Sequence, residues 1–235
     1  MNADAERILA NLKSFDDERR QRSSVAGLDE RVRALMAYQH RRFAHTYADL
    51  LKVPRYADAT RFFLDDLYGP HDFTDRDAQF ARVVPALVRL FPANVVHTVR
   101  LLSQFHALSE RLDTGLASAL STTEIDAPSY QRAWRATGEP RDRARQIELM
   151  LEIGHALDRY TSSMVLRHTL RMMRGPAKAA GLSSLQVFLE NGFDAFRALK
   201  GASDFLSTIE RRERRLVERL FDEAPVAPGD FPMAD

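Results

Sequence analysis

Glu152 and His155 come closest to a recognisable chemical motif in this sequence. The E-x-x-H spacing on a helix lets a carboxylate and an imidazole reach one metal ion, as in di-iron helical bundles. Such a site also needs a second E-x-x-H and two further glutamates, and this chain contains no second E-x-x-H. On a helical wheel, both residues lie opposite the apolar face that holds Met150 and Leu157. We therefore expect Glu152 and His155 to be exposed and to bind no metal.

Two other histidines lie near apolar positions. His168 falls on the apolar side of the same wheel if residues 141–174 form one helix, with Met164 one turn away. A histidine in such surroundings can be an axial haem ligand, but it is more often a core residue held by a hydrogen bond, which is what we expect here. His106 lies at the margin of an apolar face, with Glu110 one turn further on. That pair suits a metal ligand, an oriented base or an ordinary surface contact.

The charged clusters are explained by helix structure rather than by a binding site. The acids between residues 65 and 77 lack the alternating carboxylates and the closing glutamate of a calcium-binding EF-hand, and helix capping accounts for most of them. The arginines between residues 211 and 219 alternate with glutamates, which is typical of a solvated or ion-paired helix face and not of a nucleic-acid stripe. Three further histidines show no recognisable arrangement: His40, His45 and His97.

Composition excludes several classes of chemistry. The chain has no cysteine, which excludes disulfides, thiolate catalysis and thiolate metal sites. It carries no Walker, dinucleotide-binding or nucleophile-elbow motif. The net charge of +1 supplies no global field, so we expect neither nucleic acid nor a membrane as a partner. No apolar run has the length of a signal peptide or a spanning helix, and we expect a cytoplasmic protein.

Helices must position these side chains, because apolar residues recur with a spacing near 3.6 and most glycines and prolines lie between the periodic segments. We expect an all-α protein, at least about 60% helical, built as a single bundle of about eight to nine helices. Pro85 should kink one helix, and Gly192 should be closely packed inside another. The predicted helices cover residues 3–21, 28–51, 55–68, 75–91, 92–120, 129–137, 141–174, 185–199 and 203–221, with a break at 161–163 as the alternative to one helix over 141–174.

The chain is expected to form one domain over residues 1–221. Its length of 235 residues lies near the upper end for a single hydrophobic core. The charged helix over residues 3–21 is the element that such a domain could carry at its periphery. Residues 222–235 contain three prolines and no periodic pattern, so we expect a flexible tail.

The segment RFFLDDLYGPHDFTDRD, residues 61–77, is the sharpest architectural feature. Phe62 and Phe63 lie at the end of a helix that Tyr68-Gly69-Pro70 must stop. If both phenylalanines point inward, this helix should be wedged between two other elements; if one lies in a cleft, the segment should bind a ligand. The candidate ligand or partner face consists of Phe62, Phe63, Tyr68, His106 and His168.

This segment, followed in order by QIELMLEIGHALDRY, LRMMRGPAKAAGL and SLQVFLENGFDAFRAL, resembles a family of uncharacterised bacterial all-helical proteins. The resemblance covers about residues 55–221. It implies a shared helical fold in which the aromatic segment and the GFDAFRAL helix pack in one body. It implies no activity, so no functional residue is carried over from it.

Our leading hypothesis is a non-enzymatic helical binding or regulatory module, without a cofactor, that recognises a protein partner or a hydrophobic small molecule. A helical homodimer is compatible with this hypothesis. The alternative is an enzyme or sensor that depends on haem or on a non-haem metal such as iron. Its cofactor would lie inside the bundle near His106 and His168.

Overall fold

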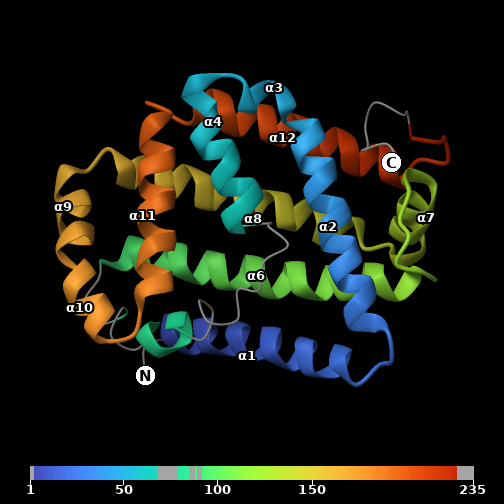
Figure 1. Ribbon diagram of the computed structural model, residues 1–235, viewed down its shortest axis with the longest axis horizontal. Coiled ribbons are helices and arrows are strands. Elements are labelled where there is room, and N and C mark those ends of the chain that lie inside the picture. The colour runs from blue at the N-terminus through green and yellow to red at the C-terminus, as the bar shows by residue number, and fades with distance from the viewer. Residues whose placement is uncertain (1–2, 68–78, 85–87, 89–91, 227–235) are drawn as a thin grey trace.

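The computed structural model describes residues 3–67, 79–84, 88 and 92–226 (Figure 1). Helices account for 84% of the structure, and the described residues contain no strand, which confirms the all-α prediction. Residues 79–84 are helical, whereas the predicted kink at Pro85 lies outside the described residues. The elements are α1 (Ala3–Ser23), α2 (Leu28–Thr46), α3 (Ala48–Leu51), α4 (Pro54–Arg61), the π-helix η1 (Phe62–Leu67), α6 (Ala93–Ala119), α7 (Ala127–Thr137), α8 (Pro140–Thr161), α9 (Met164–Met172), α10 (Arg174–Ala179), α11 (Ser183–Ala198) and α12 (Ser203–Phe221).

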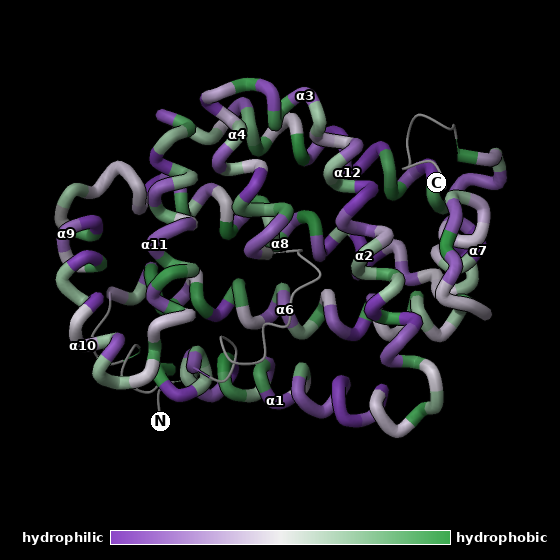
Figure 2. The backbone as a smooth tube through the Cα atoms, viewed as in Figure 1, coloured by the Kyte–Doolittle hydropathy of each residue, from purple (hydrophilic) through white to green (hydrophobic). Residues whose placement is uncertain are grey.

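The most extensive helix contacts join α1 to α6, α6 to α8 and α8 to α12. Figure 1 shows these four helices lying across the molecule, with α2, α4 and α11 crossing them, α7 at one end and α9 and α10 at the other. Hydrophobic and hydrophilic residues alternate along the helices in Figure 2, as expected where each helix buries one face. Among the described residues, no helix has both the length and the apolar character needed to cross a bilayer.

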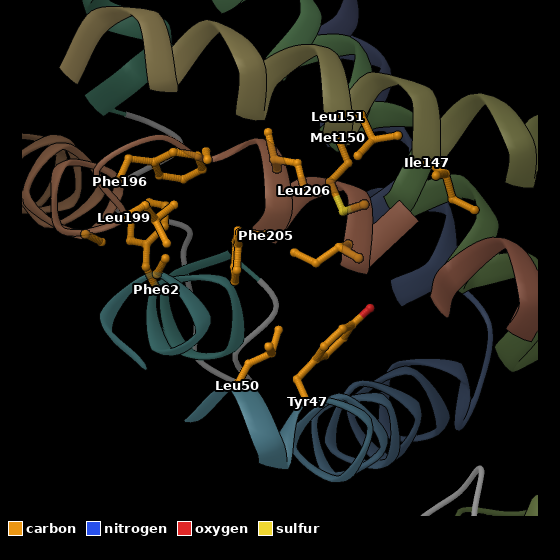
Figure 3. Close-up of a cluster of buried hydrophobic side chains, with 14 of the residues drawn as sticks. Tyr47, Leu50, Phe62, Ile147, Met150, Leu151, Phe196, Leu199, Phe205 and Leu206 are labelled. Carbon is orange, nitrogen blue, oxygen red and sulfur yellow. The ribbon is translucent and has the colours of Figure 1, made fainter. Parts of the chain in front are cut away.

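The largest apolar cluster joins α8, α11 and α12 to η1 and to the segments before it. Figure 3 shows Phe62 of η1, Phe196 of α11 and Phe205 of α12 together in this cluster. A second cluster lies between α2, α7 and the C-terminal halves of α6 and α12. At the N-terminus, α1 buries Ile8 and Phe15, so this helix packs on the body of the protein.

The predicted helix over residues 28–51 is interrupted at Tyr47, and that prediction is therefore corrected. The Thr46 hydroxyl donates to the backbone oxygen of Arg42 at 2.9 Å, a local bond that competes with regular helix geometry. Tyr47 then departs from helical geometry, with φ −113° and ψ 18°. Its side chain turns inward, and its hydroxyl donates to Glu213 at 2.6 Å.

The helix predicted over residues 55–68 continues beyond α4 as the π-helix η1, in place of a regular α-helix. Phe62, Phe63 and Leu64 all turn their side chains toward the core. In an α-helix, the side chains of three consecutive residues point in directions that span roughly 200° around the helix axis. All three side chains can be buried because η1 is wedged between other helices and contacts both α2 and α11.

The structure resolves residues 141–174 into separate helices. Ser163 begins α9 as its N-cap, and its hydroxyl accepts a hydrogen bond from the Leu166 amide at 3.3 Å. The Gly175-Pro176 pair does not end the helical region as expected, because it lies in the first turn of α10, where proline is tolerated.

The prediction that Gly192 is closely packed within a helix is confirmed. Helix α11 runs through it without a turn. A Cβ atom at this position would lie 2.7 Å from Cζ of Phe62, so the glycine lets the aromatic ring approach the helix backbone.

Asp113 of α6 lies in polar surroundings between helices. The side-chain amide of Gln39 donates to its Oδ1 at 3.1 Å. Burial raises the pKa of this carboxyl from 3.8 to about 6, although the nearby charge of Arg143 opposes the rise and that of Glu110 adds to it. The folded protein therefore holds a proton on Asp113 more tightly than the unfolded chain does.

We expect Asp113→Asn to be more stable than the wild type by about 3 kcal/mol above pH 6. The folded-state pKa is the higher one, so wild-type stability falls as the pH rises from about 4 to about 6, and the difference from the variant vanishes below that window. Denaturant melts of the wild type and of Asp113→Asn, below about pH 4 and above about pH 6, measure the difference in the free energy of unfolding. Asp16→Asn, at an exposed position, is the control. A difference that does not change with pH would contradict the assignment.

Candidate functional site

Phe62 and Phe63 lie in the core. Phe62 is only 5% exposed, and its ring centroid lies 5.4 Å from that of Phe188. Phe63 is partly buried, with the rings of Phe196 and Phe205 at 6.0 and 5.8 Å. Both side chains therefore serve the packing of η1 against α11 and α12.

A small cavity of about 20 Å³ lies beside Phe63 and Met150, with almost wholly apolar walls. That volume is about the room that one water molecule requires, and an organic ligand needs far more. Tyr68, the third aromatic residue of the predicted ligand face, lies outside the described residues.

His106 lies on α6, where its ring packs nearly perpendicular to two aromatic rings. The centroid of its ring is 6.3 Å from that of Phe15 and 6.1 Å from that of Phe105. Glu110, its neighbour one turn on, accepts hydrogen bonds from Arg19 at 3.3 Å and from Arg22 at 2.5 Å. This carboxylate therefore joins α6 to α1.

Glu152 and His155 are both exposed on α8, which confirms the exposure that the helical wheel predicted. Glu152 accepts a hydrogen bond from Arg145 at 2.9 Å, two turns earlier on the same helix. Within the part of the chain that the structure describes, no group of three or more His, Asp or Glu side chains could hold a metal ion.

His168 is exposed on α9, so the prediction of a core histidine is wrong. The helical wheel assumed one continuous helix over residues 141–174. Because α8 ends at Thr161 and α9 starts afresh at Met164, the faces of the two helices are not in phase.

The outward side of α9 instead carries the two most exposed large apolar side chains among the described residues. Met164 is 83% exposed and Met172 66% exposed. They lie eight residues apart with His168 midway, so the three side chains share one face of the helix. Met173, which follows α9, is also exposed.

The same region is cationic. From Arg159 to Leu189 the sequence contains five Arg or Lys residues and no Asp or Glu, although 33 of the 235 residues are acids. Arg171 of α9 and Lys178 of α10 are exposed. We define the α9–α10 surface by six of its exposed residues: Met164, His168, Arg171, Met172, Met173 and Lys178.

Polar contacts from α11 hold this surface in place. Gln186 donates to the backbone oxygen of Leu170 at 2.7 Å and to Glu190 at 2.8 Å. Arg174 donates to both carboxylate oxygens of Glu190 at 2.6 to 2.9 Å, and this hydrogen bonding lowers the pKa of the Glu190 carboxyl. The two short helices are therefore fixed to the body, and their outer side chains are displayed on a supported scaffold.

An acidic hollow lies on the other side of α11, between that helix and the segment formed by α4 and η1. It is open to solvent and has a volume of about 270 Å³. Phe62 and Ala195, both buried, contribute its apolar wall. Four carboxylates, one guanidinium and one amide complete the lining: Asp58, Asp65, Asp66, Asp194, Arg61 and Asn191.

At least three of these carboxylates, including Asp66, interact with other groups of the chain. Asp58 pairs with Arg61 at 3.1 Å, and Asp65 lies 3.4 Å from Nε2 of His40. Among the described residues that line the hollow, four are acidic and one is basic. An acidic lining of this kind suits a cationic group, and the α9–α10 surface suits an anionic one.

The model of a family described as "Domain of unknown function (DUF8198)" matches residues 18–227. This match contains all of residues 55–221, over which the sequence resembles an uncharacterised helical family. No curated protein and no solved structure matches the chain.

Proposed function

The chain belongs to this family of unknown function, and we propose that it is a non-enzymatic helical module that binds a protein partner through the α9–α10 surface. The observation that carries the proposal is the exposure of Met164 and Met172 within an acid-free, cationic stretch. The partner is expected to offer apolar side chains flanked by Asp or Glu.

The exposed methionines supply the apolar part of the argument. Contact with water is unfavourable for apolar side chains, and a contiguous apolar patch on a protein surface typically marks an interaction site. Methionine is flexible and polarizable, so it adapts to different partner shapes. Five of the seven large apolar side chains that are exposed among the described residues lie between α9 and α11: Met164, Met172, Met173, Val187 and Leu189.

The cations supply specificity. Arg171 and Lys178 lie beside the methionines on the same end of the molecule, in a stretch without acids of its own. Arginine can donate two parallel hydrogen bonds to a carboxylate, and opposite charges at the rim of an interface speed association and reject wrong partners. An acidic partner is therefore favoured.

An anionic membrane would offer the same charge. Helices that lie in the membrane interface usually present Trp, Phe or Leu on their apolar face. The most exposed apolar residues of α9 are methionines, and α10 is only six residues long. These features favour a protein partner over a lipid surface.

We expect Met164→Glu/Met172→Glu to weaken partner binding at least about tenfold without loss of folding, because changes at exposed positions cost little stability. Tagged wild type and variant are used to capture partners from the native host, and the affinity of the purified partner is then measured. Val25→Glu is the matched control, since Val25 is 50% exposed in the loop between α1 and α2.

Equal affinity of the wild type and the double variant for the purified partner would contradict the proposal. Binding that requires both methionines but occurs only with vesicles containing phosphatidylserine, and with no protein, would replace the protein partner by a membrane surface.

A further inference from the structure

We infer that the acidic hollow of a second copy of this chain covers the α9–α10 surface, so that two copies form a symmetric dimer across their α11 helices. This inference deepens the proposed function, because it names one partner for the same surface. It rests on two charged regions of opposite sign that flank a single helix.

The two regions are complementary in chemistry. The α9–α10 surface combines exposed methionines with Arg171 and Lys178. The acidic hollow combines a wall formed by Phe62 and Ala195 with four carboxylates. An apolar and cationic surface can therefore enter an apolar hollow lined by acids, and side chains of opposite charge then meet across the contact.

Helix α11 links the two regions. It contacts α9 and α10 on one side and α4 and η1 on the other. Val187, which is 56% exposed, shares one face of α11 with Asn191 and Asp194 of the hollow, because these positions are spaced by four and three residues. The exposed Val187 side chain therefore adds an apolar contact on the same face of α11, beside the hollow.

With a two-fold axis, the α9–α10 surface and the acidic hollow of each copy are both in contact with the other copy. In a symmetric dimer the same contact is made twice, so each copy places its cationic surface in the hollow of the other. The net charge of +1 leaves little long-range repulsion between copies, while the local separation of charge supplies attraction.

Sedimentation velocity tests the dimer directly. We expect the wild type to dimerise between about 5 and 200 µM at about 50 mM NaCl, and to associate at least about tenfold more weakly at about 500 mM, because salt screens these charges. Arg171→Glu and Asp194→Arg should each be monomeric, since each places like charges in both contacts. Mixing the two variants should restore a heterodimer, because each of its two contacts then joins opposite charges.

The control is Arg215→Glu, an exposed charge on α12 that should leave dimerisation unchanged. A monomeric wild type over the whole concentration range, single variants that still dimerise, or a mixture that stays monomeric would each overturn the dimer. A wild type that stays monomeric, yet binds a protein through Met164 and Met172, would overturn the dimer and leave the proposed function standing. A dimer that forms equally well in Met164→Glu/Met172→Glu would overturn both, because the exposed methionines would then take no part in binding.

Discussion

Glu213→Met is expected to lower the free energy of unfolding by about 3 to 5 kcal/mol. One carboxylate oxygen of Glu213 accepts hydrogen bonds from Nη1 of Arg42 at 2.8 Å and from the Tyr47 hydroxyl at 2.6 Å. All three side chains are buried between α2 and α12. Removing the carboxylate leaves a guanidinium in the core without an opposite charge, which is the costly state.

A double-mutant cycle separates the pair from its surroundings. Arg42→Met should cost a similar amount, whereas Arg42→Met/Glu213→Met should recover most of the loss, because a buried ion pair is often matched by well-packed apolar residues. The Tyr47 hydroxyl would still lack an acceptor at a cost of about 1 to 3 kcal/mol, which Tyr47→Phe should remove. Denaturant melts measure each step, and strictly additive losses would show that Arg42 and Glu213 do not act as a pair.

Phe62→Ala is expected to cost about 3 to 5 kcal/mol of stability, since the ring is buried and its removal leaves a cavity. Asp65→Ala, on the same element but exposed, should cost far less and is the matched control. Melts of both variants give the comparison. A small effect of Phe62→Ala would contradict its place in the core.

Gly192 provides a second test of the same contact. Gly192→Ala alone should destabilise the protein by about 1 to 3 kcal/mol, because the new methyl group meets the Phe62 ring. In the Phe62→Ala background the same change should be close to neutral, since the ring is gone. Equal costs in both backgrounds would mean that Phe62 and Gly192 are not in contact.

Most helices could be predicted from the sequence because they bury an apolar face that recurs every 3.6 residues. The same spacing continues through Gly192, and the phenylalanines around this glycine belong to it. The sequence therefore predicts that Gly192 is packed inside a helix and does not form a turn. The alternative break at residues 161–163 is confirmed, since Ser163 is the N-cap of α9.

The phase of a helix beyond a break could not be predicted. A helical wheel continued from α8 places His168 in the core, but the extended backbone of Ser163 between α8 and α9 changes the phase, and His168 is exposed. The buried ion pair was also missed. Arg42 and Glu213 lie 171 residues apart, and Glu213 belongs to a helix in which acids and arginines alternate as they do on a solvated face.

The α9–α10 surface did carry a signal in the sequence, namely the absence of acids from Arg159 to Leu189. That signal was masked by the balanced net charge of the whole chain. The acidic hollow carried none, because its lining comes from residues 58–66 and 191–195, which only the packing of α4 and η1 against α11 brings together.

Photo-crosslinking from the α9–α10 surface tests the central claim most directly. A photoreactive residue replaces Met172, and in a matched protein it replaces Val25; both are irradiated in the native host. We expect the Met172 position to cross-link to a protein, at a segment that contains Asp or Glu beside apolar residues, and the Val25 position to give no such product. The same product in equal yield from Val25, or no protein product from Met172, would contradict the claim that this surface binds a protein partner.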